Sequence, residues 1–142
     1  METKIQKNYI DNGFGFPVHL KNVPMIKVRG DWVLNINLNK LTLTVLDLLC
    51  HKKARLTGAE IKLIRTHFEM TLQKFAKRFS VTHVAVIKWE KSKDRCTGMN
   101  WATEKDIRLF TMTKLKESST AIARLYSSLE VAPDEKNIQI DL

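Results

Sequence analysis

The stretch LTGAEIKLIRTHFEMTLQKFAKRFSVTHVAVIKWEK, residues 56–91, decides the fold because its apolar residues recur with the spacing of three short helices. The first helix is predicted over residues 58–68. Thr57 precedes it and Glu60 follows three residues later, which is the T-x-x-E pattern of a capping box at a helix N-terminus. The helical period predicts a buried face that consists of Ile61, Ile64 and Phe68.

A second and a third helix follow with almost no linker between them. Thr71 is the predicted N-cap of the second helix. The apolar residues of this helix recur at i, i+3, i+4 and i+7, and they are Leu72, Phe75, Ala76 and Phe79. Only Ser80 and Val81 separate it from Thr82, the predicted N-cap of the third helix. Two helices joined this tightly must cross at a steep angle instead of lying antiparallel.

The third helix is predicted to have one buried side and one outward side. The side that packs against the preceding helix consists of Ala85, Val86 and Trp89. The outward side has short apolar groups flanked by cations, and its residues are His83, Val84, Ile87, Lys88 and Lys91. Such a surface suits the major groove of DNA, where thymine methyl groups take apolar contacts and guanine edges take lysine or arginine.

Residues 56–91 resemble the helix-turn-helix of the xenobiotic-response-element type, the group that contains the lambda and Cro repressors. The resemblance is closest to MqsA-like and HigA-like antitoxin regulators, whose segments begin LTGxEIRxxR. It covers about a quarter of the chain. The matching positions are the Ser/Thr cap at Thr71, the small residue of the helix crossing at Ala76, the buried turn residue at Val81, and the closing Trp89-Glu90.

This resemblance implies that the helix after Thr71 braces the DNA backbone and that the helix from Thr82 enters the major groove. Base contacts are expected from Thr82, His83, Val84, Ile87 and Lys88. Phosphate contacts are expected from Thr71, Lys74, Lys77, Arg78 and Lys91, and the flanking cations could add to them, namely Arg55, Lys62 and Arg65. The expected function is that of a sequence-specific transcriptional repressor that binds a palindromic operator on double-stranded DNA as a homodimer.

Four residues depart from the family pattern. Leu72 takes the place of a glutamine that contacts phosphate. Ser80 occupies a turn position that is usually glycine, so its backbone must adopt a conformation that suits glycine better. Val84 and Ile87 are apolar where the family often has polar residues. These two residues leave an alternative open: an antitoxin module that neutralises a protein toxin, with DNA binding secondary or absent.

The charge of the chain is uneven and favours a polyanionic partner. The net charge is +9, and residues 51–95 hold twelve Lys and Arg against four Asp and Glu. Basic surfaces bind nucleic acid because each neutralised phosphate releases counterions, although lysines also serve solubility. The sign reverses in residues 129–142, where Lys136 is outnumbered by Glu130, Asp134, Glu135 and Asp141.

The segment before the helices predicts a small β element. Residues 1–15 are polar and are predicted to form a loose arm. A turn at Arg29-Gly30-Asp31 predicts a hairpin between the last two of three short β-prone runs, which lie at 18–20, 25–28 and 32–36. Pro24 indicates that its strand is an edge strand or is interrupted.

Three further helices are predicted, and they lie from Asn39 to about Lys53, at 103–117 and at 119–130. The last two helices complete the core or form a dimer seam. The alternating residues 138–142 could add a strand to a sheet edge in this chain, in its dimer mate or in a partner.

The predicted fold class is therefore mostly α: a helix-turn-helix bundle of about six helices with a small N-terminal β-hairpin. Its expected parts are an arm with the hairpin, a helical domain with the helix-turn-helix at 71–91, and an acidic tail, and they span 1–38, 39–130 and 131–142.

Other classes of function find little support in the sequence. Cys50 and Cys96 are far apart and lack CxxC spacing, which indicates a reducing cytoplasm and no cysteine-rich zinc site. The four histidines lack metal-ligand spacing, and no nucleophile and base are suitably placed for catalysis. We therefore expect no enzymatic activity, cofactor or metal. No apolar run approaches the roughly 20 residues of a membrane helix, and the first residues lack the apolar region of a signal peptide.

Overall fold

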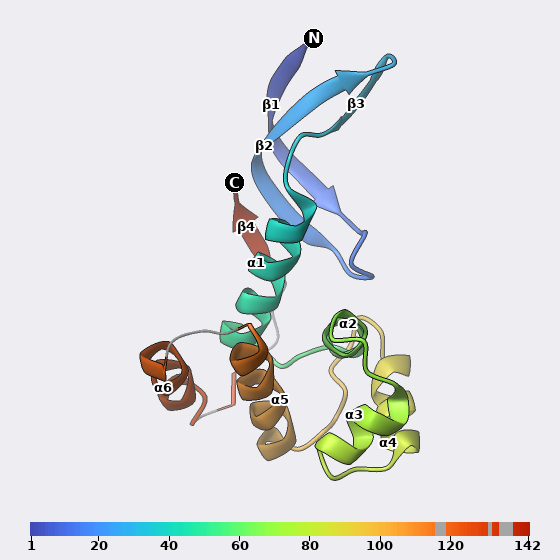
Figure 1. The fold of residues 1–142 in the computed structure, drawn as a ribbon, viewed down its shortest axis with the longest axis vertical. Helices are drawn as coiled ribbons and strands as arrows, with labels where there is room; N and C mark the ends of the chain where they lie inside the picture. Colours follow the sequence, from blue (N-terminus) through green and yellow to red (C-terminus); the bar gives the residue numbers. More distant parts are fainter. Residues whose placement is uncertain (116–118, 131, 134–137) are drawn as a thin grey trace.

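The computed structural model describes residues 1–115, 119–130, 132–133 and 138–142. The helices found there are α1 (Leu38–His51), α2 (Gly58–His67), α3 (Leu72–Arg78), α4 (His83–Lys91), α5 (Trp101–Lys114) and α6 (Ser119–Ser128). The strands found there are β1 (Thr3–Asp11), β2 (Val18–Val28), β3 (Asp31–Leu34) and β4 (Gln139–Asp141). The chain therefore mixes α and β structure (Figure 1), and the prediction of a mostly α bundle with only a small hairpin is wrong.

Strand β2 is the centre of the four-stranded sheet. It pairs antiparallel with β1 along Thr3–Asp11, so most of the predicted loose arm is an ordered strand. On its other side, Met25–Val28 pairs antiparallel with β3, which confirms the predicted hairpin. The turn residues Arg29 and Gly30 have φ values of 52° and 87°, as a tight two-residue hairpin turn requires. The runs at 18–20 and 25–28 belong to one strand.

The face that β2 buries changes at Asn22. Val18 and Leu20 are buried before this residue, and Val23 and Met25 are buried after it. Asn22 has a φ of 54°, a left-handed conformation that asparagine adopts more readily than most residues. The pairing with β1 keeps the same register on both sides of this point. Strand β1 must therefore change its faces at the same level.

Strand β4 comes from the last part of the chain and pairs in parallel with His19–Lys21 of β2. Of the three sheets that the alternating residues 138–142 could join, the structure selects the sheet of this chain. Ile138 and Ile140 are buried there, and the side-chain amide of Asn22 donates to the carboxylate of Asp141 at 2.7 Å. Much of the predicted acidic tail falls on residues 131 and 134–137, which lie outside the described residues.

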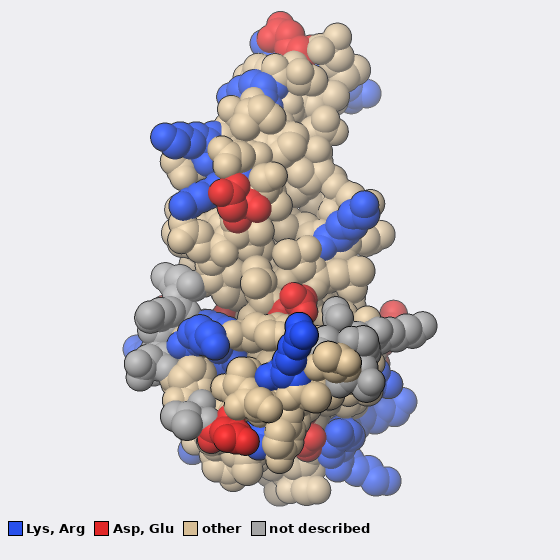
Figure 2. All heavy atoms as spheres, turned by 90° about the vertical axis from the view of Figure 1, so that its left-hand side faces the viewer, with Lys and Arg blue, Asp and Glu red and all other residues tan. Residues whose placement is uncertain are grey.

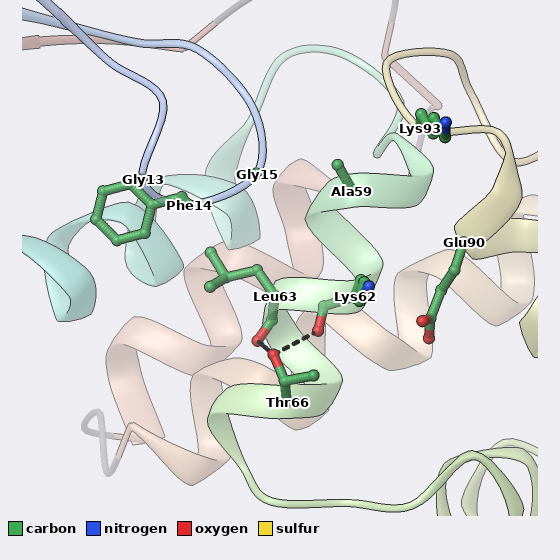
Figure 3. Close-up of a pocket in the computed structure, with 9 residues that line it drawn as sticks. All are labelled: Gly13, Phe14, Gly15, Ala59, Lys62, Leu63, Thr66, Glu90 and Lys93. Carbon is green, nitrogen blue, oxygen red and sulfur yellow. Dashed lines mark hydrogen bonds between the residues drawn. The ribbon is translucent and has the colours of Figure 1, made fainter.

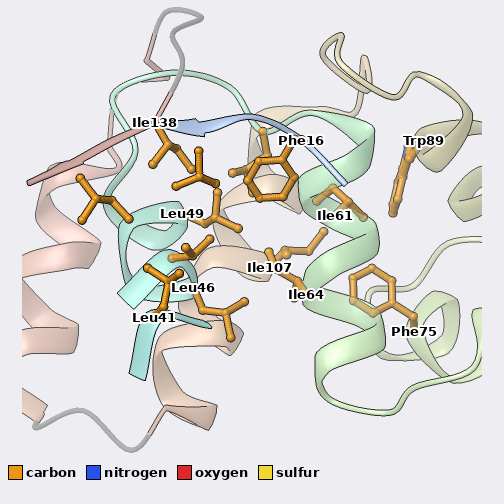
Figure 4. Close-up of a cluster of buried hydrophobic side chains, with 14 of the residues drawn as sticks. Phe16, Leu41, Leu46, Leu49, Ile61, Ile64, Phe75, Trp89, Ile107 and Ile138 are labelled. Atoms are coloured by element: carbon orange, nitrogen blue, oxygen red, sulfur yellow. The ribbon is translucent and has the colours of Figure 1, made fainter. Parts of the chain in front are cut away.

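One hydrophobic core joins the sheet to the helices (Figure 4). Helix α1 leads from the sheet to the helical end of the molecule, where α2, α3 and α4 lie on one side of α5 and α6 lies on the other (Figure 1). The core residues labelled in Figure 4 come from both ends and are Phe16, Leu41, Leu46, Leu49, Ile61, Ile64, Phe75, Trp89, Ile107 and Ile138.

A smaller buried cluster joins α1, α5 and α6 and consists of Cys50, Met112, Leu125 and Leu129. The described parts of the last two predicted helices thus complete the core of this chain. Helix α1 is capped by Asn37 and α5 by Asn100, two and three residues before the predicted starts of these helices at residues 39 and 103.

Candidate nucleic-acid interface

Helices α2, α3 and α4 form the predicted three-helix unit, and each begins at the predicted cap. The hydroxyl oxygens of Thr57, Thr71 and Thr82 accept hydrogen bonds from backbone N–H groups three residues later, at 3.3, 3.1 and 3.1 Å. The capping box of α2 is complete, because the carboxylate of Glu60 accepts from the backbone N–H of Thr57 at 2.9 Å. Local side-chain chemistry therefore sets where these helices start.

The turn between α3 and α4 has the backbone expected of it. Ser80 has a φ of 57°, in the left-handed region that favours glycine. The backbone N–H of Val81 donates to the carbonyl of Ala76 at 3.0 Å and closes the end of α3. This sharp turn lets the two helices cross with Phe75, Val86 and Trp89 buried between them and the core.

The N-terminus of α2 lies directly against the chain that follows α4. The backbone N–H of Gly58 donates to the carbonyl of Arg95 at 3.2 Å, and the N–H of Ala59 donates to the carbonyl of Lys93 at 2.9 Å. A Cβ on Gly58 would overlap the carbonyl oxygen of Trp89. The glycine of the LTGxE pattern is therefore the residue that lets α4 and α2 approach each other.

An ion pair fixes α4 on α2. The guanidinium of Arg65 donates to both carboxylate oxygens of Glu90, at 2.6 and 2.9 Å, and to the carbonyl of Met70 at 3.0 Å. The hydrogen bond to Glu90 raises the pKa of Arg65, although burial acts against it. Two planar, parallel bonds hold orientation as well as distance, so this pair sets the angle at which α4 is presented.

The predicted base-reading residues lie on one exposed side of α4. His83, Val84 and Lys88 are exposed, and Ile87 is half-buried beside them. The side chain of Val84 is 61% exposed, more than the exposed valines of the sheet, Val28 and Val33. The hydroxyl of Thr82 is exposed too, and its cap bond uses only an acceptor, so its proton remains able to donate.

Most of the predicted phosphate-contacting residues surround this side. Thr71, Lys74, Lys77 and Lys91 are exposed. Arg78 is different: its guanidinium donates to the carboxylate of Asp106 at 3.1 and 3.4 Å. The same guanidinium lies over the rings of Phe79 and Phe110. A phosphate would have to compete with these contacts for Arg78.

Two of the three flanking cations serve the fold. Arg65 holds Glu90 as described, and Arg55 donates to the buried carboxylate of Glu104 at 3.0 Å. Lys62 is exposed. Two further exposed cations, Lys93 and Arg95, follow α4 and were not among the predicted phosphate contacts. The basic run K-S-K-D-R after Glu90 was the available signal for them.

The three-helix unit has few carboxylates to offset its lysines. Between Thr71 and Lys91 the sequence contains one carboxylate, Glu90, and that group is occupied by Arg65. The opposite face of the molecule, which carries α6, has a different character: Figure 2 shows basic and acidic side chains interspersed among the described residues there. Over residues 71–95, seven Lys and Arg therefore stand against two carboxylates, Glu90 and Asp94.

A buried charged network supports the unit from the side of α5. Arg108 is fully buried and donates to the carboxylate of Glu104 at 2.9 Å. It also donates to three carbonyls at the end of α1 and in the linker to α2, those of Cys50, Lys52 and Ala54. Burial lowers the pKa of Arg108 against the opposing effect of Glu104. The network ties the linker before α2 to α5. The i,i+4 spacing of Glu104 and Arg108 was an available signal for their pair, but the sequence gave none for the carbonyls that Arg108 binds.

A hollow of about 570 Å³ lies beside the unit, between the β1–β2 loop and α2 (Figure 3). Phe14 and Leu63 line its apolar part, and Lys62, Glu90 and Lys93 line its polar part. Among the described residues, the buried side-chain polar atom that has no hydrogen-bond partner is Nε of Arg108, which does not line this hollow. Among the described residues, therefore, no buried polar atom without a hydrogen-bond partner points into this hollow to indicate a ligand.

Comparisons of the chain with protein-family models, curated proteins and solved structures found no match. In the described residues, no cluster of three His, Cys, Asp or Glu side chains is arranged to bind a metal ion. None of the helices described is long and apolar enough to cross a bilayer.

Proposed function

We propose that this chain is a sequence-specific DNA-binding transcriptional regulator, a repressor that acts in the cytoplasm and reads the major groove with α4. The observation that carries the proposal is the exposed side of α4, which presents hydrogen-bond donors and short apolar groups. The N-cap Thr82, the tight turn before α4 and the Arg65–Glu90 pair hold this helix in place. The cations around it meet no free carboxylate between Thr71 and Lys91.

The roles of the side chains follow from their chemistry. Lys88 and His83 have donors for the acceptor atoms of base edges, and Val84 with Ile87 suits thymine methyl groups. Lys74, Lys77 and Lys91 neutralise phosphates, which positions the protein without reading the sequence. Three phosphate contacts per copy predict a slope of log affinity against log salt of about −2.7 per copy, or about −5.4 for a two-fold dimer.

The decisive experiment is enrichment of bound sequences from a random pool of duplex DNA, followed by affinity measurements against salt. The proposal expects an inverted repeat, because a two-fold homodimer reads two half-sites. Substitution of Val84 by Ala should reduce the discrimination between bases at one base pair of the enriched sequence by about 1 kcal/mol or more. Lys77→Ala should weaken binding to all sequences and reduce the salt slope by about 1 per copy.

Lys40→Ala provides a control, because Lys40 is an exposed lysine on α1, outside the three-helix unit. It should leave both the enriched sequence and the salt slope unchanged. Salt-dependent binding without any enriched sequence would refute base reading. Unchanged specificity in Val84→Ala together with relaxed specificity in Lys77→Ala would refute the assignment of roles.

A second function is favoured by one observation, the 61% exposure of Val84 beside Ile87. In this alternative, the apolar part of α4 binds a protein toxin, and DNA binding is secondary or absent. A chain that binds no duplex DNA at low salt would support this alternative over the repressor.

A further inference from the structure

Strand β1 leaves one long edge of the sheet open among the described residues. The strand order is β1-β2-β3, and β4 also pairs with β2, so nothing described pairs with the outer side of β1. An open edge presents backbone N–H and C=O groups with which another strand can pair. The hydrogen bonds that β2 makes on the side away from β1 show which residues of β1 present these groups.

Three residues of β2 direct their backbone groups away from β1. The bonds that show this are His19 N–H to the carbonyl of Ile138 (3.4 Å), Leu142 N–H to that of Lys21 (2.7 Å) and Asn35 N–H to that of Pro24 (2.9 Å). In an antiparallel ladder, a residue directly opposite such a residue also directs its own groups outward. The β1 residues opposite these three are Ile10, Asn8 and Ile5. Their N–H and C=O groups therefore face the open edge.

The same edge carries two exposed isoleucines. Ile5 is 65% exposed and Ile10 is 54% exposed. They are five residues apart and would lie on opposite faces of an ideal strand. The change of face at the level of Asn22 instead places both on the outer face, because their partners in β2 alternate with the buried residues Leu20 and Val23.

We propose that β1 pairs antiparallel with β1 of a second copy of this chain, about a two-fold axis between Lys7 and Asn8. This register sets Ile5 opposite Ile10 of the second copy. It also sets Lys4 opposite Asp11 of the second copy. Symmetry forms each contact twice. The pairing therefore covers both exposed isoleucines and forms two cross-strand ion pairs.

The faces and the backbone agree with this register. Lys4 and Asp11 are on the inner side of β1, opposite the buried Met25 and Val18. Ile5 and Ile10, whose backbone groups both face outward, pair with each other in this register, and Asn8 pairs with Lys7 beside the two-fold axis. The side-chain amide of Gln6 donates to the carbonyl of Asn8 at 2.8 Å, and a carbonyl oxygen has a second lone pair for a strand partner.

Neighbouring registers lack this complementarity. A shift by one residue sets inner side chains opposite outer ones and no longer aligns the outward backbone groups. A shift by two residues sets Ile5 opposite Asn8 or Asn12, and in one direction it sets Asp11 opposite Glu2, a like-charge pair. The pairing itself does not depend on DNA binding, although it would supply the two-fold symmetry that an inverted repeat requires.

The test is sedimentation of the purified chain without DNA, so its failure is distinct from failure of the proposed function. The wild-type chain should shift with concentration from 16.4 kDa to twice that mass. Lys4→Glu and Asp11→Lys each turn two attractive pairs into repulsive ones and should each weaken the dimer about tenfold or more. Mixing these two variants restores both ion pairs between unlike chains, so a heterodimer should form in the mixture.

Lys27→Glu is the matched control, because Lys27 and Lys4 both lie over the ring of Trp32, but Lys27 is on the central strand. It should leave the dimer unchanged. Ile5→Pro tests the backbone separately: it removes an N–H that faces the open edge, so the monomer should stay folded by circular dichroism while the dimer is lost.

Three results would overturn the inference. They are a wild-type chain that stays monomeric at the highest soluble concentration, a mixture of the two charge variants that stays monomeric while both are folded, and a folded Ile5→Pro variant that still dimerises as the wild type does.

Discussion

For the substitution of Gly58 by Ala, helix propensity and tertiary packing predict opposite changes in the free energy of unfolding. Gly58 is the first residue of α2, and helix propensity alone predicts that alanine stabilises the chain by up to about 1 kcal/mol. The structure predicts the reverse. The added Cβ would overlap the carbonyl oxygen of Trp89 and would lie 2.5 Å from Oγ of Ser92 and 2.8 Å from the backbone nitrogen of Lys93.

The size of the effect follows from what must move. Two of the three obstructing atoms belong to the backbone, one inside α4 and one just after it, so a side-chain rotation cannot relieve the overlap. Overpacking of this kind costs about 1–3 kcal/mol. Separating the two segments also weakens the hydrogen bonds that Gly58 and Ala59 donate to Arg95 and Lys93, at about 1 kcal/mol each. After the propensity gain, the free energy of unfolding should fall by about 3 kcal/mol, which lowers Tm by about 10 °C.

The assay is urea and thermal unfolding followed by circular dichroism, with Gly13→Ala as the control. A Cβ on Gly13 meets only the far end of the Asp11 side chain, at 3.1 Å, and Gly13 has no positive φ. The control should change Tm by about 2 °C or less. If Gly58→Ala unfolds at or above the wild-type temperature, then α2 and α4 do not approach as closely as described, and the account of the LTG glycine is wrong.

Three further changes test other parts of the molecule. Ser80→Gly relieves the left-handed φ in the α3–α4 turn and should raise the free energy of unfolding by about 0.5–1 kcal/mol in urea titrations; a decrease would contradict the strain. Arg108→Ala leaves the buried Glu104 short of a partner and should cost about 4 kcal/mol or prevent folding, whereas a loss below about 1 kcal/mol in the same titration would show that the network is dispensable. Ile140→Ala should cost about 2–4 kcal/mol because its side chain is buried beside β2, and an unchanged Tm would mean that β4 is not docked.

The parts of the fold that the sequence predicted are those set by local chemistry. Thr57, Thr71 and Thr82 bond to backbone groups three residues away, so their signal lies within one turn of helix. The turn at Arg29-Gly30 is equally local. The exposed side of α4 followed from helical periodicity, because residues that point away from Val86 need no distant partner to be placed.

The sheet was underestimated because its evidence is not local. The side chains of β1 are mainly polar or exposed, so the strand lacks the apolar alternation that identifies a half-buried strand. Its backbone pairs with β2 all the same. Pro24 was expected to mark an edge or an interruption, yet it lies inside the central strand. The missing N–H of Pro24 would point to the side where β3 has just ended, so the sheet loses at most one backbone hydrogen bond there.

The arginines show the same limit in the candidate interface. Arg55, Arg65 and Arg78 looked like phosphate ligands because they flank the motif. In the structure they donate to carboxylates 49, 25 and 28 residues further along the chain. Sequence spacing does not encode such pairs, because only the tertiary fold brings the charges together. The lysines of α3 and α4 were easier to place, since an exposed lysine needs no partner.

The parallel pairing of β4 with β2 has a consequence for the order of events during synthesis. Gln139 follows its partner His19 by 120 residues, so Leu20 and its neighbours must wait for most of the chain to be made. At translation rates of about 5–20 residues per second, this delay is about 6–24 s. Throughout that interval one margin of β2 is available to strands of other nascent chains. Residues 139–141 thus cover an edge of β2, the second strand to be made, and contacts so distant in sequence slow the completion of the fold.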